Sequence, residues 1–444
     1  MIQLLSKIVE IHGRRDFTKE QMQAFQEKQL RRLLHFAFHN SHFYRQLYLG
    51  RGITEDMLDT IKLSELPLVS KELLMEHFDD VVTDKSLKKK DLQVWIEENP
   101  DTRNLYKNEF VVIHTSGTSG NMGIFVYDQK AWNNLKASLV TRVSTPSLNP
   151  LQKTRIAFYA ATHGRFAGIS LVNDAPSLLY DIRTFSLLKP IAETLEELNA
   201  FQPHQLSGYA STIAQLALFQ KSGKLSINPM RIMVGGDVLT HEYERVIKDV
   251  WECPLIDLYA ASESVGIAAR LPNTNYFKVF DDLQIVEVLD DNNEEVAAGK
   301  DGQVVLTNLY NFTFPMIRYQ LGDIAVRGHH GDDPQFSSIK KFVGRANDAL
   351  PILLDDKKQD SLHPIVLSEF FVSGVEKVQF VMEKPGSILL KYMAKADADT
   401  AVVKKFEELL KAKGAAKGTK VKVKRVKELP NNSKTGKFQL VINY

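Results

Sequence analysis

From Glu109 onward, short apolar runs alternate with turn residues and then with stretches of helical periodicity, and this alternation restricts the possible fold more than any other feature. The runs are FVVIH, RIAFYA, RIMVGG and PLIDLY. The helical stretches that follow them span residues 129–144, 190–201, 211–222 and 240–251. Buried strands that are each followed by a helix are typical of a largely parallel sheet covered by helices. The sequence therefore predicts an α/β fold.

The chain on either side of this region has a different texture. In the first hundred residues, apolar positions recur at three- and four-residue intervals between charged positions, which predicts a layer of helices. After residue 281, the runs QIVEVL, GQVVLTN and DIAVR alternate apolar with polar residues, which is typical of an antiparallel sheet with one exposed face. We therefore predict a helical region at 1–108, an α/β core at 109–280 and a small β subdomain at 281–345.

A second boundary is marked by a change of composition near residues 343–348. Beyond this boundary, residues 346–444 are expected to form a small, mobile α+β domain that follows a large N-terminal domain at 1–345. Residues 401–444 contain 12 Lys and Arg against three acidic residues, so the local charge is 12 − 3 = +9. Such a charge run is most often a solvated surface. The alternative is a lid that meets phosphate groups.

Composition excludes several classes of protein and partner. The net charge of +2 over 444 residues gives no global attraction to nucleic acid, and no stretch approaches the roughly 20 apolar residues that span a bilayer. Cys253 is the only cysteine and cannot form an internal disulfide. Charges interrupt the apolar run in the first residues, unlike a secretory signal. The expected compartment is the cytoplasm, with neither membrane nor nucleic acid as a partner.

The densest chemical signal is HTSGTSGNMG at residues 114–123, directly after a predicted strand. Small residues leave backbone N–H groups unobstructed and add hydroxyl donors, as a loop that wraps phosphate oxygens requires. No lysine follows the glycines in the spacing of a Walker A loop. Taken alone, the tract also fits an ordinary flexible turn.

Four further clusters have compositions that suit a nucleotide site. LYAASE at 258–263 ends a predicted strand with an aromatic ring that can stack on a base and a carboxylate that can hold Mg²⁺. RYQLGD at 318–323 ends in an Asp that can accept from ribose hydroxyls. FVGRANDAL places Arg345 at the predicted domain boundary, where its guanidinium can reach phosphate or ribose. PNNSKTGKFQL places Lys437 in a turn near the C-terminus.

These five motifs occur in the order and approximate spacing of the adenylate-forming superfamily, which the chain resembles: acyl-CoA synthetases, luciferases and peptide-synthetase adenylation domains. The closer resemblance is to the phenylacetate-CoA ligase branch and its relatives, the deazaflavin-adenylating synthetases. It is carried by HNSHFYRQLY, LPLVSKELL and TNLYNFTFPMIRYQLGD. The resemblance spans almost the whole chain and implies ATP-dependent adenylation of a small carboxylic acid, expected to be aromatic. Pyrophosphate would leave, and the acyl group would pass to a thiol, with CoA as the leading acceptor.

The resemblance implies a role for each matched nucleotide-binding residue. The phosphate loop would cradle the β- and γ-phosphates of ATP and comprises Thr115, Ser116, Gly117, Thr118, Ser119 and Gly120. Gly235, Gly236 and Asp237 would face the adenine, on which Tyr259 would stack.

The remaining matched residues would act on the ribose, the α-phosphate and the metal. Ser262 would touch the α-phosphate, and Glu263 would hold Mg²⁺. Asp323 would bind the ribose hydroxyls, and Arg345 the ribose or a phosphate. Lys437 would bridge the attacking carboxylate and the α-phosphate, where negative charge builds up.

The sequence departs from the superfamily pattern at three places. Asn121 and Met122 stand where many relatives close the phosphate loop with lysine, and Asn347 occupies the hinge position without the usual charge. The segment PILLDDKKQDSLHPIVL lacks the usual glycine-containing loop that meets the pantetheine arm. That departure keeps other acceptors open: a carrier-protein thiol, an amine or a phenolic hydroxyl. A catalytically silent nucleotide-binding regulator is the alternative from another class, and a homodimer also stays open.

Candidate residues for the acyl pocket come from FYAATHGRFAG and SGYAS. They are Phe158, Tyr159, His163, Arg165 and Tyr209. Apolar and aromatic groups suit a planar aromatic acid, and His163 or Arg165 could meet a polar substituent. Phe158 and Tyr159 lie on a predicted core strand, so packing is the competing interpretation for both.

Overall fold

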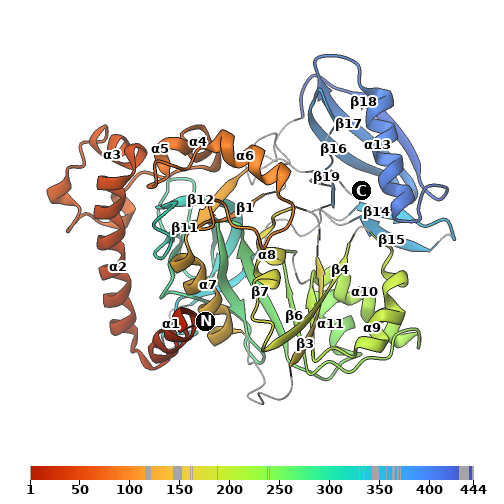
Figure 1. Ribbon diagram of the computed structural model, residues 1–444, viewed down its shortest axis with the longest axis horizontal. Coiled ribbons are helices and arrows are strands. Elements are labelled where there is room, and N and C mark those ends of the chain that lie inside the picture. Colours follow the sequence, from red (N-terminus) through yellow and green to blue (C-terminus); the bar gives the residue numbers. More distant parts are fainter. Residues whose placement is uncertain are drawn as a thin grey trace.

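The computed structural model describes residues 2–442 apart from 116–121, 144–152, 161, 163, 188, 238, 240, 330, 334, 343–349, 357, 363–365, 368–369, 371 and 430–439. Figure 1 shows a large N-terminal part, residues 2–342, and a smaller C-terminal part, residues 350–442, which lies beside it and is coloured blue. Among the described residues, no helix combines the length and apolar character needed to cross a bilayer.

The first hundred residues form a layer of helices, as the periodicity predicts. These helices are α1 (Ile2–Gly13), α2 (Lys19–Asn40), α3 (His42–Leu49), α4 (Lys71–Glu76), α5 (Phe78–Val81) and α6 (Lys89–Glu98). The longest, α2, begins at a capping box: the Thr18 hydroxyl accepts from the Gln21 N–H, and the Gln21 side chain accepts from the Thr18 N–H. Its buried face packs into the largest hydrophobic core and includes Leu30, Leu33, Leu34 and Ala37.

The α/β region forms five adjacent parallel strands, which confirms the predicted fold class. In spatial order they are β7 (Leu255–Ala261), β6 (Arg231–Gly235), β5 (Gln205–Gly208), β3 (Thr154–Ala160) and β4 (Tyr180–Ser186). The predicted helices are present as α7 (Gln129–Arg142), α9 (Leu195–Phe201), α10 (Ala210–Lys221) and α11 (His241–Lys248). The run FVVIH differs from the expectation, because β1 (Val111–His114) pairs antiparallel with β2 (Ile124–Tyr127) as a separate two-stranded sheet.

The strands after β7 are antiparallel, as their alternating pattern predicts, but they extend the same sheet. In spatial order from β7 they are β8 (Ser264–Arg270), β9 (Phe277–Val279), β13 (Ser338–Phe342), β12 (Tyr319–Arg327), β11 (Asp301–Asn308) and β10 (Gln284–Leu289). The connection runs through β9 and β13, where Ile339 pairs with Phe277. The β subdomain predicted at 281–345 is therefore joined to the α/β core by backbone hydrogen bonds across one eleven-stranded sheet of described residues.

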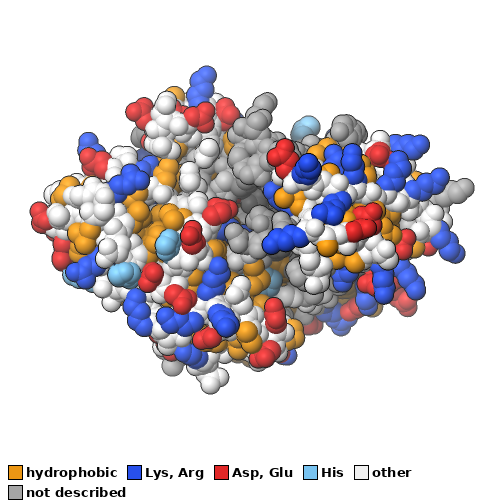
Figure 2. Space-filling model, turned by 90° about the horizontal axis from the view of Figure 1, so that it is seen from above, with side chains coloured by type: hydrophobic (Ala, Val, Ile, Leu, Met, Phe, Trp, Pro, Cys, Tyr) orange, Lys and Arg blue, Asp and Glu red, His pale blue; other side chains and the backbone are white. Residues whose placement is uncertain are grey.

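The C-terminal part has a four-stranded sheet and a hydrophobic core of its own. Its elements are β14 (Leu350–Leu353), β15 (Gln359–Leu362), β16 (Val375–Lys384), β17 (Ser387–Ala394), α13 (Asp399–Ala412), β18 (Lys420–Arg425) and β19 (Val441–Ile442). The edge strand β18 exposes Lys420, Lys422 and Lys424. Figure 2 shows several Lys and Arg side chains over this side of the molecule.

The two parts meet around a buried ion pair. Lys413 Nζ lies 3.4 Å from Asp360 Oδ2, and these side chains are only 4% and 3% exposed. The other Asp360 oxygen accepts from Gln215 Nε2 of α10 at 3.1 Å, and Lys413 also donates to the Lys189 carbonyl at 3.4 Å. Val366 packs into the apolar cluster that contains the core-facing residues of α10. These contacts hold the C-terminal part against the end of the sheet that contains β3 and β5.

Candidate active site

A cavity of about 300 Å³ brings together four of the residues predicted to bind the nucleotide. It is lined by Gly236, Asp237, Tyr259 and Asp323. The first three follow or end the parallel strands β6 and β7 at their carboxyl ends, which is where ligands bind in open α/β sheets. Asp323 reaches the same cavity from β12, in the antiparallel half of the sheet. The cavity therefore lies where the two halves of the sheet meet.

Tyr259 and Asp323 are in direct contact in this cavity. The Tyr259 hydroxyl donates to Asp323 Oδ2 at 2.8 Å, which fixes the orientation of the carboxylate. The ring of Phe342 stacks on Tyr259 with 3.6 Å between the ring centroids and 15° between the planes. With Phe342 in place, only the opposite face of Tyr259 can accept a base. Sequence reasoning missed Phe342, although it begins the run FVGRAND that was singled out for Arg345.

The loop after β6 is shaped by a glycine and a helix cap. Gly236 has φ +85°, and a Cβ there would come within 2.6 Å of Tyr209 Cε1, so this position requires glycine. The Asp237 carboxylate accepts from the backbone N–H groups of Ala210 and Ser211 at 2.6 and 3.1 Å. Asp237 thus caps the start of α10 and supports the loop. Tyr209, predicted for the acyl pocket, packs against Gly236 in this loop.

Glu263 lies in the tight turn between β7 and β8 and is 8% exposed. The Tyr319 hydroxyl donates to Glu263 Oε1 at 2.9 Å, and the Tyr127 hydroxyl lies 2.8 Å from the Ser262 carbonyl oxygen. These two buried tyrosines fix the turn and orient the carboxylate. Mg²⁺ in nucleotide sites is usually held by one or two carboxylates together with substrate phosphates. The donor set at Glu263 therefore fits the ion predicted for it.

The base of the phosphate loop is closed by Thr115 and Gly123. The Thr115 N–H donates to the Gly123 carbonyl at 2.8 Å, and the Gly123 N–H donates to Thr115 Oγ1 at 2.9 Å. Lys71 Nζ, from the first residue of α4, donates to the same hydroxyl at 3.0 Å. The predicted loop residues 116–120 lie outside the described residues. A lysine from the helical layer therefore lies at the base of a loop whose own sequence ends without one.

The contacts of Arg165 argue against its predicted contact with a substrate. The side chain is fully buried, and its guanidinium packs 4.3 Å from the centroid of the Trp95 ring. Its five N–H groups donate at 2.5–3.3 Å to the carbonyls of Val112, Asn99, Asp101, Thr102 and Asn104. Burial lowers the pKa of Arg165 to about 10, which leaves it charged at neutral pH. No guanidinium N–H remains for a substituent on the acid.

His114 connects Arg165 to the base of the loop. The Arg165 backbone N–H donates to His114 Nε2 at 3.0 Å, and His114 Nδ1 lies 3.1 Å from the Thr115 carbonyl. Because Nε2 accepts, the neutral ring carries its proton on Nδ1 and donates it to Thr115. A Cβ on Gly164, which has φ +76°, would come within 3.0 Å of His114 Nε2. The buried arginine therefore positions Thr115 through the imidazole.

The other acyl-pocket candidates have different surroundings. Tyr159 is 1% exposed, stacks on Phe185 with ring centroids 4.8 Å apart, and forms a 2.6 Å hydrogen bond with the Thr194 hydroxyl. It belongs to the core, which agrees with the packing interpretation. Phe158 is half-buried on the opposite face of β3. Besides the loop residues 116–120, four more predicted residues lie outside the described residues: His163, Arg345, Asn347 and Lys437.

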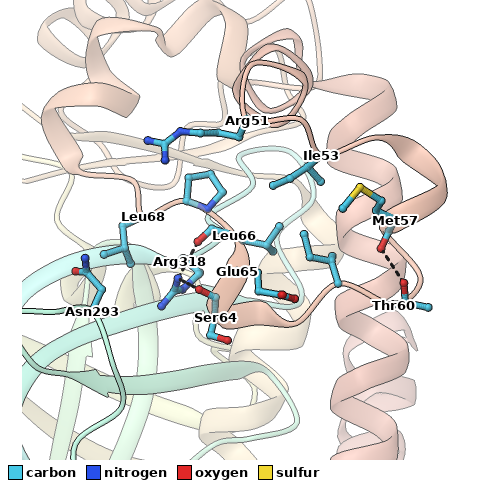
Figure 3. A pocket seen from close by; sticks show the side chains of 12 residues that line it. Arg51, Ile53, Met57, Thr60, Ser64, Glu65, Leu66, Leu68, Asn293 and Arg318 are labelled. Carbon is cyan, nitrogen blue, oxygen red and sulfur yellow. Dashed lines mark hydrogen bonds between the residues drawn. The ribbon is translucent and has the colours of Figure 1, made fainter.

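A larger cavity of about 720 Å³ lies elsewhere, between the segment 51–68 and the sheet (Figure 3). Of the motif residues, it contains Arg318, the first residue of RYQLGD, and Leu66, Pro67 and Leu68, which begin LPLVSKELL. The Arg318 guanidinium donates to the carbonyls of Ser64 and Leu66, both at 2.7 Å, and pairs with Glu287 at 3.0 Å. This arginine therefore holds the wall of the cavity. The cavity contains none of the residues predicted to bind ATP.

Comparison with known proteins gives distant relatives over most of the chain. No family model matches. Protein CapK from Staphylococcus aureus is 21% identical over 410 residues, which cover 84% of this chain and 78% of that protein. Phenylacetate-coenzyme A ligases from Thermus thermophilus and Escherichia coli are each 22% identical, cover 75% of this chain, and are themselves covered to 72% and 73%.

Solved structures with the same fold include a 2-hydroxyisobutyryl-CoA ligase. Its complex with 2-HIB-AMP and CoA in the thioesterification state superposes with a TM-score of 0.62 at 17% identity, covering 97% of this chain and 91% of the ligase. The same ligase in the postadenylation state gives a TM-score of 0.56 at 18% identity, covering 96% and 90%. The fold of this chain, including its C-terminal part, is that of these ligases.

Proposed function

We propose, from the confirmed resemblance to the adenylate-forming superfamily and its phenylacetate-CoA ligase-like branch, that this chain is an AMP-forming ligase. It activates a small carboxylic acid with ATP, releases pyrophosphate and transfers the acyl group to the thiol of CoA. The observation that carries the proposal is the Tyr259–Asp323 hydrogen bond at 2.8 Å, inside a cavity at the carboxyl ends of the parallel strands. An aromatic ring can stack on the base of a nucleotide, and a carboxylate held beside that ring can accept hydrogen bonds from the ribose of the same nucleotide.

In this proposal, different residues bind different parts of the nucleotide. Tyr259 and the Gly236 loop receive the adenine, Asp323 accepts from the ribose hydroxyls, and Ser262 faces the α-phosphate. Thr115 opens the phosphate loop, and Lys71 supplies positive charge at its base. Glu263 would hold Mg²⁺, which neutralises phosphate charge when it is bound.

The reaction requires further positive charge at the point of attack. A carboxylate that attacks the α-phosphate brings two anionic groups together, so a cation is needed where charge increases. Lys437 takes this role in the proposal, and Arg345 contacts the ribose or phosphate. The C-terminal part, turning about Asn347, excludes water from the labile acyl adenylate.

An aromatic acid is the proposed substrate class, and fewer residues remain to line its pocket than the sequence suggests. Arg165 and Tyr159 are buried in the protein interior, so the residues left as candidates for the acyl pocket are Phe158, His163 and Tyr209. None of these three carries a permanent charge. We therefore expect uncharged aromatic acids to be activated in preference to acids with a second carboxylate.

Pyrophosphate exchange into ATP tests the proposed function. The purified full chain is incubated with ATP, labelled pyrophosphate and a panel of aromatic, aliphatic and phenolic compounds, with and without CoA. Exchange that depends on one class of acid, together with thioester formation when CoA is added, is the expected result. Exchange without thioester formation would indicate that the acyl acceptor is not CoA. Absence of pyrophosphate exchange with every acid, while ATP still binds, would overturn the proposed function.

Lys71 should contribute to ATP binding through the phosphate loop. Lys71→Met removes a cation that donates to Thr115 at 3.0 Å, and losing a charge-assisted contact costs about 1.5–3 kcal/mol, so kcat/KM for ATP should fall about 10- to 100-fold. Lys89→Met is the matched control, because Lys89 lies in the same helical layer but donates to the Met75 carbonyl instead of Thr115. Equal kcat/KM values for ATP in the two variants would contradict the role of Lys71.

A further inference from the structure

We propose that His35, His39, Glu55 and Asp59 form a surface site for one divalent transition-metal ion of the zinc class. The four side chains lie outside the candidate active site and belong to none of the motifs that indicate nucleotide binding. Two come from α2, and two come from the segment that follows α3. The proposal is independent of the proposed function.

The two histidines are arranged for joint binding by the helix itself. His35 and His39 are four residues apart in α2, so their side chains project from one face about one turn apart. Glu55 and Asp59 are also four residues apart and begin and follow the short 3₁₀ helix η2 (Glu55–Met57). Each acid faces one histidine across the gap between the two segments.

The donor atoms of these side chains already lie close together in pairs. His35 Nε2 is 2.9 Å from Asp59 Oδ1, and His39 Nε2 is 2.7 Å from Glu55 Oε1. Among the described residues, His35, His39 and Glu55 are the group of three or more potential ligands whose donor atoms all fall within 4.8 Å of one another. Tetrahedral zinc, with ligands at about 2.0–2.2 Å, needs donor atoms about 3.3–3.5 Å apart. The three grouped donors would have to approach one another by up to about 1.5 Å, and Asp59, which lies outside that group, would join them through its contact with His35. Partly exposed side chains can make such shifts by rotation.

The donor types select the class of ion. Imidazole nitrogen with carboxylate oxygen suits zinc, nickel and copper, whereas magnesium and calcium prefer oxygen alone. The alternative is a pair of surface histidine–carboxylate contacts, each worth about 0–1 kcal/mol and without any preference for a metal. The two arrangements differ in one measurable respect: only a metal site requires both histidines at once.

A bound ion would connect α2 to the wall of the larger cavity. Ile53, Met57 and Thr60 come from the same segment as the two acids, and Figure 3 shows them along one side of that cavity. Holding Glu55 and Asp59 against α2 would fix this wall. The expected consequence is a metal-dependent rise in thermal stability, which is a readout separate from any catalytic activity.

Cobalt titration of the full chain tests the proposal. After treatment with a chelator, the protein should bind one equivalent of Co²⁺ with visible absorption bands of a four-coordinate site, and Zn²⁺ should displace them. His39→Asn and His35→Asn should each lower Co²⁺ affinity by at least about 10-fold, because changes even to residues that only support metal ligands cost that much. His42→Asn is the matched control, an exposed histidine at the start of α3.

The outcomes separate a built site from non-specific binding. Bands and a Zn²⁺-dependent rise in melting temperature that persist in His42→Asn but disappear in His39→Asn support the site. Equal Co²⁺ binding by all variants, or binding by none of them, would overturn it. Both histidines are partly exposed, with 33% and 54% of the side chain accessible, so the variants should fold, and circular dichroism checks this.

Discussion

Lys437→Ala should reduce the rate of acyl-adenylate formation on the order of 10²- to 10³-fold, the effect of removing one donor that stabilises charge in a transition state. Nucleotide affinity should change little, because Tyr259 and Asp323, proposed to contact the adenine and the ribose, belong to the N-terminal part. Acid-dependent pyrophosphate exchange measures the first quantity, and equilibrium titration with ATP measures the second. A loss in kcat without a matching loss of ATP binding is the expected signature.

Lys434→Ala provides the control for this experiment. Lys434 lies three residues earlier in the same run, NNSKTGK. Its replacement by alanine removes the same charge from the same basic stretch. If both variants lose exchange equally, the effect is a general electrostatic one of the basic C-terminus. If neither does, another group stabilises the charge of the reacting phosphate. Only a selective loss in Lys437→Ala supports the assigned role.

Arg165→Leu should lower the free energy of unfolding by about 4 kcal/mol or more. Five carbonyl oxygens would lose the guanidinium at once. The bonds to Val112 and Thr102 are the fully buried ones, and each buried polar group left unsatisfied costs about 1–3 kcal/mol. Urea unfolding of the N-terminal part measures the change. Arg155→Leu is the control: Arg155 Nε donates to a single exposed carbonyl, that of Gln202, and the loss should stay below about 1 kcal/mol.

The same variant distinguishes a structural arginine from a substrate-binding one. An Arg165→Leu protein of unchanged stability but altered preference among acids would mean that the guanidinium contacts the substrate, against the geometry described above. Arg165→Lys offers a second comparison, because it keeps the charge but loses the planar fork that donates to five acceptors. Its stability should fall between those of the wild-type protein and Arg165→Leu.

Local periodicity was enough to predict the elements, but not how they are joined. The helices and strands between β3 and β7 follow the predicted runs closely, because each run carries its own apolar pattern. Alternation after residue 281 correctly indicated antiparallel strands. It carried no information on the pairing of β13 with β9, which joins residues about 60 positions apart. The separate pairing of β1 with β2 was missed for the same reason, since a short apolar run does not specify its neighbour.

The candidate site could be predicted where its residues follow strands. Gly236, Asp237 and Tyr259 meet because the carboxyl ends of parallel strands share one edge, and Asp323 was found through its motif. Arg165 was misinterpreted because an arginine between glycine and an aromatic residue suits a pocket equally well. Four of its five acceptors lie in an irregular segment at 99–104 without a periodic pattern, and the fifth, Val112, lies in β1. Lys71 was missed because it precedes Thr115 by 44 residues.

The buried pair of Lys413 and Asp360 bears on how easily the C-terminal part can change its position. Both charges belong to that part: Lys413 directly follows α13, and Asp360 lies in β15. Among the described residues, the N-terminal part contributes the neutral Gln215 amide and the Lys189 carbonyl. A rotation would therefore carry the two charges into water together, each still beside its opposite. Neither partner is stranded alone in the interior, the outcome that makes breaking a buried ion pair costly. If the C-terminal part rotates as proposed, water can replace these contacts on opening, and the contacts can form again on return.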